Sequence, residues 1–238
     1  MVFRNPFRKL DSFEWFLWIV SIGIVSGSFF ISGGFYLLTL ITSLVGVTAL
    51  IFVAKGDVWG QILTVLFSLL YAVISLEFRY FGEMITYLGM TLPIALLSIL
   101  SWLRNPYSST TEVKIHQLSN RQKLWMVVSA SIITCLFYFV LSAFNTRNLL
   151  ISTLSITTSF LASYLMLFRS PGYALAFAAN DLVLIVMWIL AAINDLSYLP
   201  MIACFVMFLL NDIYGFINWK RMKKRQQICV VNSIGLSS

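Results

Sequence analysis

Long hydrophobic runs, separated by short polar or basic connections, follow one another along the whole chain. A helix needs about 20 consecutive apolar residues to cross the hydrocarbon core of a bilayer. Eight runs come close to this length, and we predict a membrane-spanning helix from each. The predicted spans cover approximately Phe13–Ile31, Phe35–Ala54, Trp59–Phe78, Ile85–Leu103, Leu124–Phe144, Asn148–Phe168, Gly172–Ile193 and Leu199–Trp219.

The connections between the spans contain turn-forming and charged residues. Gly33–Gly34 interrupts the chain after the first span, and a turn at residues 55–57 follows the second. Glu77 and Glu83 are predicted to lie in the loop after the third span. Pro93 lies in the middle of the fourth span and predicts a kink there, because proline cannot donate a backbone hydrogen bond.

The Lys and Arg residues lie almost entirely on one side of this arrangement. Of the 16, all but Arg79 and Arg147 fall in the N-terminus, the loop Arg104–Lys123, two short turns and the tail 220–238. Loops that remain in the cytoplasm are enriched in Lys and Arg. We therefore predict that both termini are cytoplasmic. The same loops account for the net charge of +7, so no nucleic-acid partner is predicted.

The composition argues against a soluble enzyme. Hydrophobic residues make up 60% of the 238 and charged residues 11%, whereas soluble proteins have roughly half and a quarter. The spans use most of the chain, which predicts a single membrane domain over residues 1–238. No paired-cysteine zinc spacing, HExxH, GxSxG or P-loop motif occurs, and the one histidine, His116, lies in a polar loop. We predict no catalytic residue, no metal and no cofactor.

The second to fourth spans are similar in sequence to the sixth to eighth. Thr42–Ser43 falls on Thr158–Ser159, and Trp102 at the end of the fourth span falls on Trp219 at the end of the eighth. Parallel repeats occur in transporters, so we predict an all-α polytopic membrane protein with a 3+1+3 core. Its parts are an extra N-terminal span (13–31), a first repeat (35–103), an inverting helix (124–144), a second repeat (148–219) and a basic tail (220–238).

Two Asn–Asp pairs interrupt the apolar runs, Asn180–Asp181 in the seventh span and Asn211–Asp212 in the eighth. Both lie about eight residues from the predicted cytoplasmic end, hence roughly 12 Å deep in a hydrocarbon core about 30 Å thick. An ionised Asp in hydrocarbon costs at least a few kcal/mol, so it normally faces a protein interior or a watery path. Two pairs at one depth predict a shared substrate site. Polar bonding between helices is the alternative.

The third span carries a polar stripe at helical spacing, which predicts that one of its faces lines the bundle interior. The stripe consists of Gln61, Thr64, Ser68, Tyr71 and Ser75. It either lines a substrate path or packs against other helices. The sixth span has a stripe of small residues, which predicts close helix packing. This second stripe consists of Ser152, Ser155, Ser159 and Ala162.

Two motifs add to this picture. The chain ends its last span with YGFINWKR at Tyr214–Arg221, and an earlier segment contains Gly82, Glu83, Pro93 and Trp102. Together with the 3+1+3 plan, they resemble the Pnu-type vitamin transporters, most of all the PnuC nicotinamide riboside or mononucleotide transporters of Gram-positive bacteria. The resemblance covers nearly the whole chain. It implies a SWEET-like fold in the bacterial cytoplasmic membrane and facilitated uptake, followed by trapping of the substrate by a cytoplasmic kinase.

The resemblance also implies a substrate site midway through the bundle, between aromatic rings and amide side chains. By position, it implies as binding residues Trp59, Tyr71, Asn180, Trp188, Asn211 and Tyr214. Gln61 of the polar stripe and the carboxylates of Asp181 and Asp212 complete the predicted site. The chain departs from the family pattern at Tyr173 and Phe177, where tryptophans are typical, so the resemblance does not fix which vitamin is carried.

The leading hypothesis is a facilitator for nicotinamide riboside. This substrate has a cationic aromatic ring, which aromatic faces attract and a carboxylate balances, and ribose hydroxyl groups that suit Asn amides. Thiamine, another cationic aromatic, and deoxynucleosides are alternative substrates. A non-transporting membrane scaffold is the alternative from a different class. The predicted partners are therefore a small molecule and the lipid bilayer, and association into a homo-oligomer stays open.

Overall fold

The computed structural model describes residues 5–31, 37–77, 80–108, 110–146, 148–193 and 198–235, with side chains up to residue 228. Eight helices of this described part are long and apolar enough to cross a membrane. The predicted all-α fold class with eight spans is therefore confirmed. The predicted break at Gly33–Gly34 lies outside the described residues.

A short 3-10 helix, Pro6–Lys9, precedes the first span. The helices that follow are α1 (Ser12–Ile31), α2 (Leu37–Ala54), α3 (Val58–Glu77), α4 (Phe81–Thr86), the π-helical turn η2 (Tyr87–Thr91), α5 (Leu92–Arg104), α6 (Asn120–Ala143), α7 (Leu149–Leu167), α8 (Tyr173–Ala192) and α9 (Leu199–Gly235). The turn η2 joins α4 and α5 into a single span.

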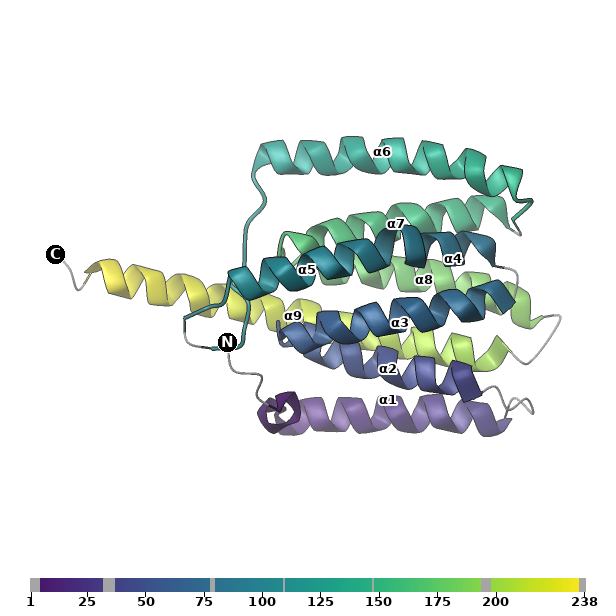
Figure 1. The fold of residues 1–238 in the computed structure, drawn as a ribbon. Coiled ribbons are helices and arrows are strands. Elements are labelled where there is room, and N and C mark those ends of the chain that lie inside the picture. Colours follow the sequence, from purple (N-terminus) through teal and green to yellow (C-terminus); the bar gives the residue numbers. More distant parts are fainter. Residues whose placement is uncertain are drawn as a thin grey trace.

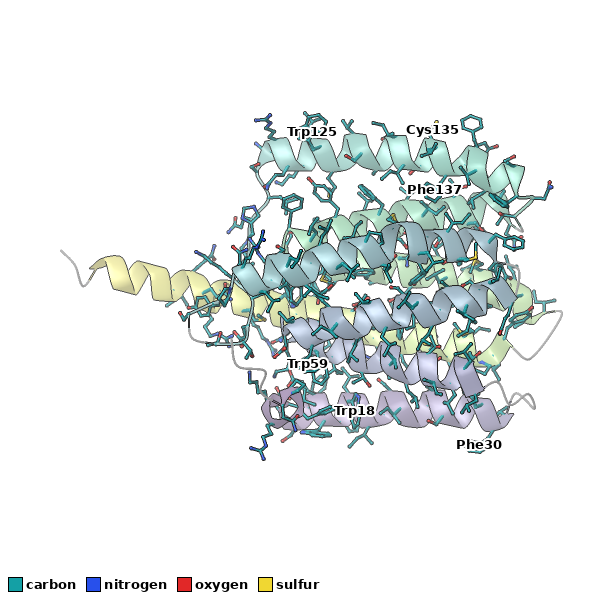
Figure 2. The ribbon with its side chains drawn as sticks, viewed as in Figure 1. Trp18, Phe30, Trp59, Trp125, Cys135 and Phe137 are labelled. Carbon is teal, nitrogen blue, oxygen red and sulfur yellow. The ribbon has the colours of Figure 1, made fainter. Side chains whose placement is uncertain are left out.

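Six spans form the body of the bundle, and two lie at its edges (Figure 1). α2, α3 and α5 pack with α7, α8 and α9, and the two groups meet through α2 with α9 and through α5 with α7. α1 packs on α2 and α9 at one edge. α6 packs along α7 at the opposite edge, where Trp125 and Cys135 are exposed on its surface (Figure 2). The residue bounds of the two repeats stay a prediction.

The fourth span departs from a regular α-helix just before Pro93. The backbone N–H of Leu92 donates to the carbonyl of Tyr87, which is the spacing of a π-helix. Pro93 then lies in the first turn of α5, and the π-helical turn directly before it accommodates the missing N–H. The predicted distortion is present, but it precedes the proline by a turn and places Tyr87 and Thr91 toward the bundle interior, where both are buried.

The predicted loop position of Glu83 is wrong. Glu83 lies in α4 and is 1% exposed. Its neighbour Gly82 has Leu141 of α6 and Ser152 of α7 within contact distance of the position that a Cβ would occupy. A side chain at Gly82 would be crowded there, so the glycine allows α4 to pack closely against α6 and α7. This packing carries Glu83 into the interior.

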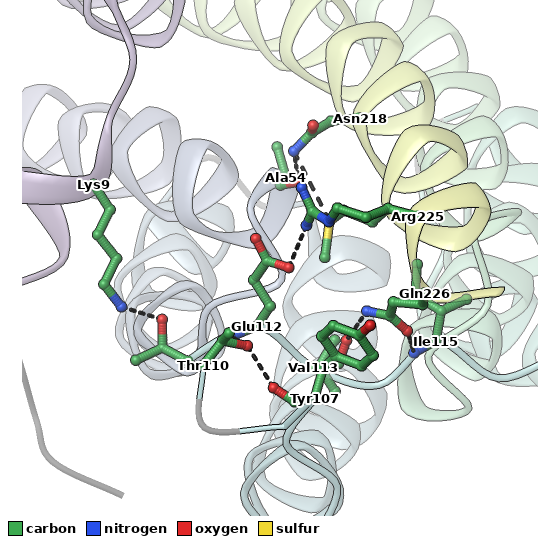
Figure 3. A network of polar contacts seen from close by, with 12 residues as sticks. Lys9, Ala54, Tyr107, Thr110, Glu112, Val113, Ile115, Asn218, Arg225 and Gln226 are labelled. Carbon is green, nitrogen blue, oxygen red and sulfur yellow. Dashed lines mark hydrogen bonds and ion pairs between the residues drawn. The ribbon is translucent and has the colours of Figure 1, made fainter. Parts of the chain in front are cut away.

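One end of the bundle holds the 3-10 helix Pro6–Lys9, the turn between α2 and α3, the described residues between α5 and α6 and the extension of α9; we call it the basic end (Figure 1). Helix α9 does not stop at Trp219, as the sequence predicted, but continues through the basic tail. Its extension binds the segment 105–119: Arg225 pairs with Glu112, and the side-chain amide of Gln226 bonds to the backbone of Val113 and Ile115 (Figure 3).

Candidate functional site

A buried cavity of about 60 Å³ lies at the centre of the bundle. Residues of α2, α3, α5, α7, α8 and α9 and of the turn η2 line it. Its polar lining includes Gln61, Thr64, Ser159, Asn180, Asp181 and Asp212. Four of the nine residues that the sequence predicts for the substrate site therefore face one space, although they come from three different helices.

Asp181 of α8 and Asp212 of α9 form the acidic centre of this cavity. Each residue is 3% exposed, and the two carboxyl groups lie within hydrogen-bonding contact of each other. No Lys, Arg or His belongs to the described lining, and Asp181 Oδ2 has no hydrogen-bond partner among the described residues. Two carboxyl groups this close cannot both be ionised unless a cation lies beside them, so the pair shares a proton or binds a positive group.

Asn180 is held by hydroxyl groups of α7. Its Oδ1 accepts hydrogen bonds from Thr158 (2.8 Å) and Ser159 (3.0 Å), and the hydroxyl of Ser155 lies 3.5 Å away. The amide oxygen is thus directed toward α7. The nitrogen of the same amide is left for the cavity, which the residue lines. Asn180 therefore presents hydrogen-bond donors to any molecule in the cavity.

Gln61 adds a second amide from the opposite wall. The side chain lies in α3, one turn after the start of the helix, and the residue is 1% exposed. Its Nε2 has no hydrogen-bond partner among the described residues. A buried amide donor without a partner costs about 1–3 kcal/mol. A ligand oxygen that accepts from Gln61 would remove this cost.

Aromatic rings surround the acidic centre. Phe67, Tyr87, Phe177 and Phe208 line the cavity. Tyr71 is absent from the lining but stacks on Phe67, with ring centroids 5.4 Å apart, and lies 4.4 Å from Tyr87.

Trp188 lies behind this aromatic group and donates its indole N–H to the Tyr71 hydroxyl at 3.3 Å. Both residues are fully buried. The structure therefore places two predicted binding residues, Tyr71 and Trp188, where they support the aromatic wall from behind.

The structure places three other predicted residues on the side of α9 and α3 that faces α1. Asn211 donates to the Ser21 hydroxyl at 3.1 Å, and Tyr214 donates to Glu14 at 2.6 Å. Trp59 packs in the same apolar cluster as Tyr214, close to α1 (Figure 2). These side chains are not part of the cavity lining.

The sequence did not predict the contacts of two groups of polar residues. Ser155 and Ser159 were assigned to close packing, yet their hydroxyls contact Asn180. Glu14 of α1 is 1% exposed and binds both Lys55 and Tyr214 at 2.6 Å. A glutamate near the start of the first span looks like an interfacial residue in the sequence, so only its position in the fold reveals these contacts.

Two tryptophans bond to the backbone of cavity-lining residues near the basic end. Trp102 of α5 donates its indole N–H to the Met166 carbonyl of α7 at 3.3 Å, and Trp219 of α9 donates to the Val53 carbonyl of α2 at 2.9 Å. The two rings lie 5.6 Å apart. Val53 and Met166 also line the cavity. A tryptophan of each helix group, α2, α3 and α5 or α7, α8 and α9, thus donates to a backbone carbonyl of the other group.

Comparison with known proteins gives consistent results. A family model described as "Nicotinamide mononucleotide transporter" matches residues 36–221. The nicotinamide riboside transporter PnuC of Neisseria mucosa is 25% identical over 227 residues, which cover 93% of this chain and 86% of that protein. Its counterpart of the same name from Haemophilus influenzae is 25% identical over 190 residues, covering 79% and 81%.

A solved structure has a similar fold. The chain of the "Crystal structure of the Vitamin B3 transporter PnuC" superimposes with a TM-score of 0.80 and 24% sequence identity. The match covers 91% of this chain and 94% of that one.

Proposed function

Because this chain belongs to the nicotinamide mononucleotide transporter family, whose members are transporters and not enzymes, we propose that it carries nicotinamide riboside through the central cavity. The resemblance identified in the sequence is confirmed by the family model. Both curated relatives are named as nicotinamide riboside transporters.

The observation that carries the proposal is the buried acidic pair. Asp181 and Asp212 lie together in a cavity whose described lining has no basic residue. With one shared proton, the pair holds one negative charge. The pyridinium ring of nicotinamide riboside holds one positive charge, so the substrate would neutralise the site. A neutral nucleoside would leave the charge unbalanced in a poorly solvated interior, where that is costly.

The other lining residues fit the remaining parts of such a substrate. Rings at Phe67, Tyr87, Phe177 and Phe208 can lie against a cationic aromatic ring, an attraction worth about 0.5–2 kcal/mol. The amide N–H groups of Gln61 and Asn180 suit the carboxamide oxygen or the ribose hydroxyls. Tyr71 and Trp188 support these rings from behind. Asn211, Tyr214 and Trp59 contribute indirectly, by holding α9 in position.

The volume of the cavity implies that transport involves a conformational change. About 60 Å³ is far below the roughly 300–1,000 Å³ of sites that hold small organic ligands. The bundle would widen to admit a nucleoside, and the contacts of Trp102 and Trp219 are the ones that separate when it opens toward the basic end. Rocking of one repeat against the other is the general mechanism of repeat-built transporters.

The proposal extends to the setting of the transporter. It acts in the bacterial cytoplasmic membrane as a facilitator, both termini are cytoplasmic, and a cytoplasmic kinase traps the substrate. The clustering of Lys and Arg at the basic end supports this orientation. In a variant without native cysteines, a cysteine at Asn145 should react with an impermeant reagent from outside. A cysteine at Thr110 should react only after the membrane is opened, and the reverse pattern would refute the orientation.

Association into a homo-oligomer is also part of the proposal; the exposed apolar side chains of α6, at the edge of the bundle, suit lipid and a second copy equally. Mass measurement of the protein in detergent tests this: a monomer alone would contradict it.

Uptake into proteoliposomes tests the proposed substrate. Labelled nicotinamide riboside should enter saturably and stop at equal concentrations inside and outside, because the vesicles contain no kinase. Unlabelled thiamine and deoxynucleosides should compete weakly. Saturable uptake of one of these alone would reassign the substrate, and no saturable uptake of any would favour a scaffold. Accumulation that a protonophore abolishes would instead indicate coupling to protons.

A further inference from the structure

A chain of hydrogen bonds connects Glu83 to the cavity without Glu83 lining it. Ser155 of α7 stands between Glu83 of α4 and Asn180 of α8. Its Oγ lies 3.0 Å from Glu83 Oε1 and 3.5 Å from Asn180 Oδ1. All three residues are at most 2% exposed. The second carboxyl oxygen, Oε2, has no hydrogen-bond partner among the described residues.

Ser155 has a single hydroxyl hydrogen for two acceptor oxygens. An ionised Glu83 is an acceptor only, so it would take that hydrogen and turn the Ser155 oxygen toward Asn180 as an acceptor. A protonated Glu83 would donate to Ser155, and Ser155 would then donate to Asn180 Oδ1. The orientation of the Asn180 amide, with its oxygen toward the hydroxyls of α7, is the one that the second arrangement stabilises.

The other hydroxyls cannot replace Ser155 fully. The single hydrogen of Thr158 has three acceptors within reach, because its oxygen lies 3.0 Å from the carbonyls of Leu154 and Ser155 and 2.8 Å from Asn180. Among the described residues, Ser159 is the one hydroxyl that donates to Asn180 alone. Ser155 therefore adds to the hold that Ser159 has on the amide oxygen, and this added part depends on where the Ser155 hydrogen goes.

The surroundings of Glu83 favour its neutral form. Of the described titratable groups, Tyr71 of α3 and Tyr87 of η2 lie near it, and Asp181 of α8 and Asp212 of α9 lie near the same Tyr87. α7 contributes hydroxyl groups. No Lys or Arg of the described chain forms an ion pair with Glu83. An ionised carboxylate with one hydrogen bond in such a place is costly.

We propose that Glu83 is a positioning residue. In its protonated form, it acts through Ser155 to keep the donor face of the Asn180 amide toward the cavity. This inference rests on the proposed function only for the identity of the substrate. It predicts that ionisation of Glu83, which does not line the cavity, weakens binding by releasing the Asn180 amide. The effect depends on the protonation of Glu83 and does not require a change in the protonation of Asp181 or Asp212.

Infrared spectroscopy tests the protonation of Glu83 and its hydrogen bond to Ser155 without any substrate. The purified protein should show the carbonyl stretch of a protonated carboxylic acid that Glu83→Gln removes. Ser155→Ala should shift this band, because it removes the hydrogen-bond partner. Thr153→Ala is the matched control, since Thr153 lies on α7 toward α6 and donates to the Leu149 carbonyl. A spectrum without such a band, or a band that Ser155→Ala leaves in place, would overturn the proposal whatever the protein carries.

Uptake gives the second readout. In the Glu83→Gln variant, the glutamine amide donates to Ser155 as a protonated carboxyl group does. The KM of this variant should therefore equal the wild-type KM at low pH and should not rise with pH. Ser155→Ala should raise KM by about two- to tenfold, the worth of one hydrogen bond, and should also lose the pH dependence. If Glu83→Gln raises KM as much as Ser155→Ala, Glu83 acts by charge or shape and the relay is refuted.

Discussion

The same dipeptide, Asn–Asp, occurs in α8 and α9 at the same depth, and the two copies do different things. In α8, Asn180 and Asp181 both line the cavity. In α9, Asp212 lines it, but Asn211 turns away and bonds to Ser21 of α1. Successive residues of a helix are about 100° apart around its axis, so two neighbours line one cavity only when the helix turns the boundary between them toward it, as α8 does and α9 does not. One face of α9 therefore lines the cavity, and another face binds α1.

Asn180→Leu and Asn211→Leu compare the two faces directly, with the largest expected effect. Leucine keeps the size of the side chain and removes its hydrogen bonds. Asn180→Leu should lower uptake at low substrate concentration by about tenfold or more, because it removes a donor from the site and leaves the Ser159 hydroxyl without its acceptor. Asn211→Leu should leave KM unchanged and lower the melting temperature.

The measurements are uptake kinetics in proteoliposomes and thermal unfolding in detergent. An Asn211→Leu variant that loses substrate affinity while α1 stays in place would show that both copies of the dipeptide belong to the site.

Glu14→Gln tests the face of α9 that binds α1. Glu14 binds Lys55 and Tyr214 together and is almost fully buried, so the substitution leaves a cation without its partner. We expect a loss of about 1–3 kcal/mol in the free energy of unfolding. The ratio of nicotinamide riboside to thiamine uptake should stay unchanged. A change in that ratio would mean that α1 takes part in selecting the substrate.

Arg225→Gln gives the smallest effect. Arg225 lies on the extension of α9 and pairs with Glu112 at a largely exposed position. Exposed ion pairs contribute about 0–1 kcal/mol, so stability should change by less than that and uptake should stay at the wild-type level. A large loss of uptake with unchanged stability would assign the extension a part in opening the basic end.

The sequence predicts the depth of the two Asn–Asp pairs but not the direction in which each side chain faces, and the reason is physical. Hydropathy and charge place the spans and the depth of both Asn–Asp pairs, because those depend on position along one helix. Which of Asn211 and Asp212 faces the cavity depends on the rotation of α9. Contacts with Ser21 and Glu14, almost two hundred residues earlier in the chain, stabilise that rotation.

Glu83 was missed for a related reason. A carboxylate shortly after Glu77, between two apolar runs, looks like a loop residue in the sequence. Its burial follows from the close packing that Gly82 allows against α6 and α7 and from the hydroxyl of Ser155. Both are properties of helices that come together only in the folded bundle.

Asp181 and Asp212 are proposed to hold a cation, and the affinities for a charged and for a neutral ligand test this most directly. Nicotinamide riboside and its reduced, uncharged form have nearly the same shape. The double variant Asp181→Asn, Asp212→Asn keeps the size of both side chains and removes the negative charge. Each single variant keeps one carboxylate and should lose less than the double variant.

We predict that the double variant binds nicotinamide riboside five- to a hundredfold more weakly, on the order of 1–3 kcal/mol, and binds the reduced form almost as wild type does. Tyr214→Phe, on the other face of α9, should change neither affinity. Equal binding of both ligands by wild type and the double variant would contradict the account, since the acidic pair would then be structural.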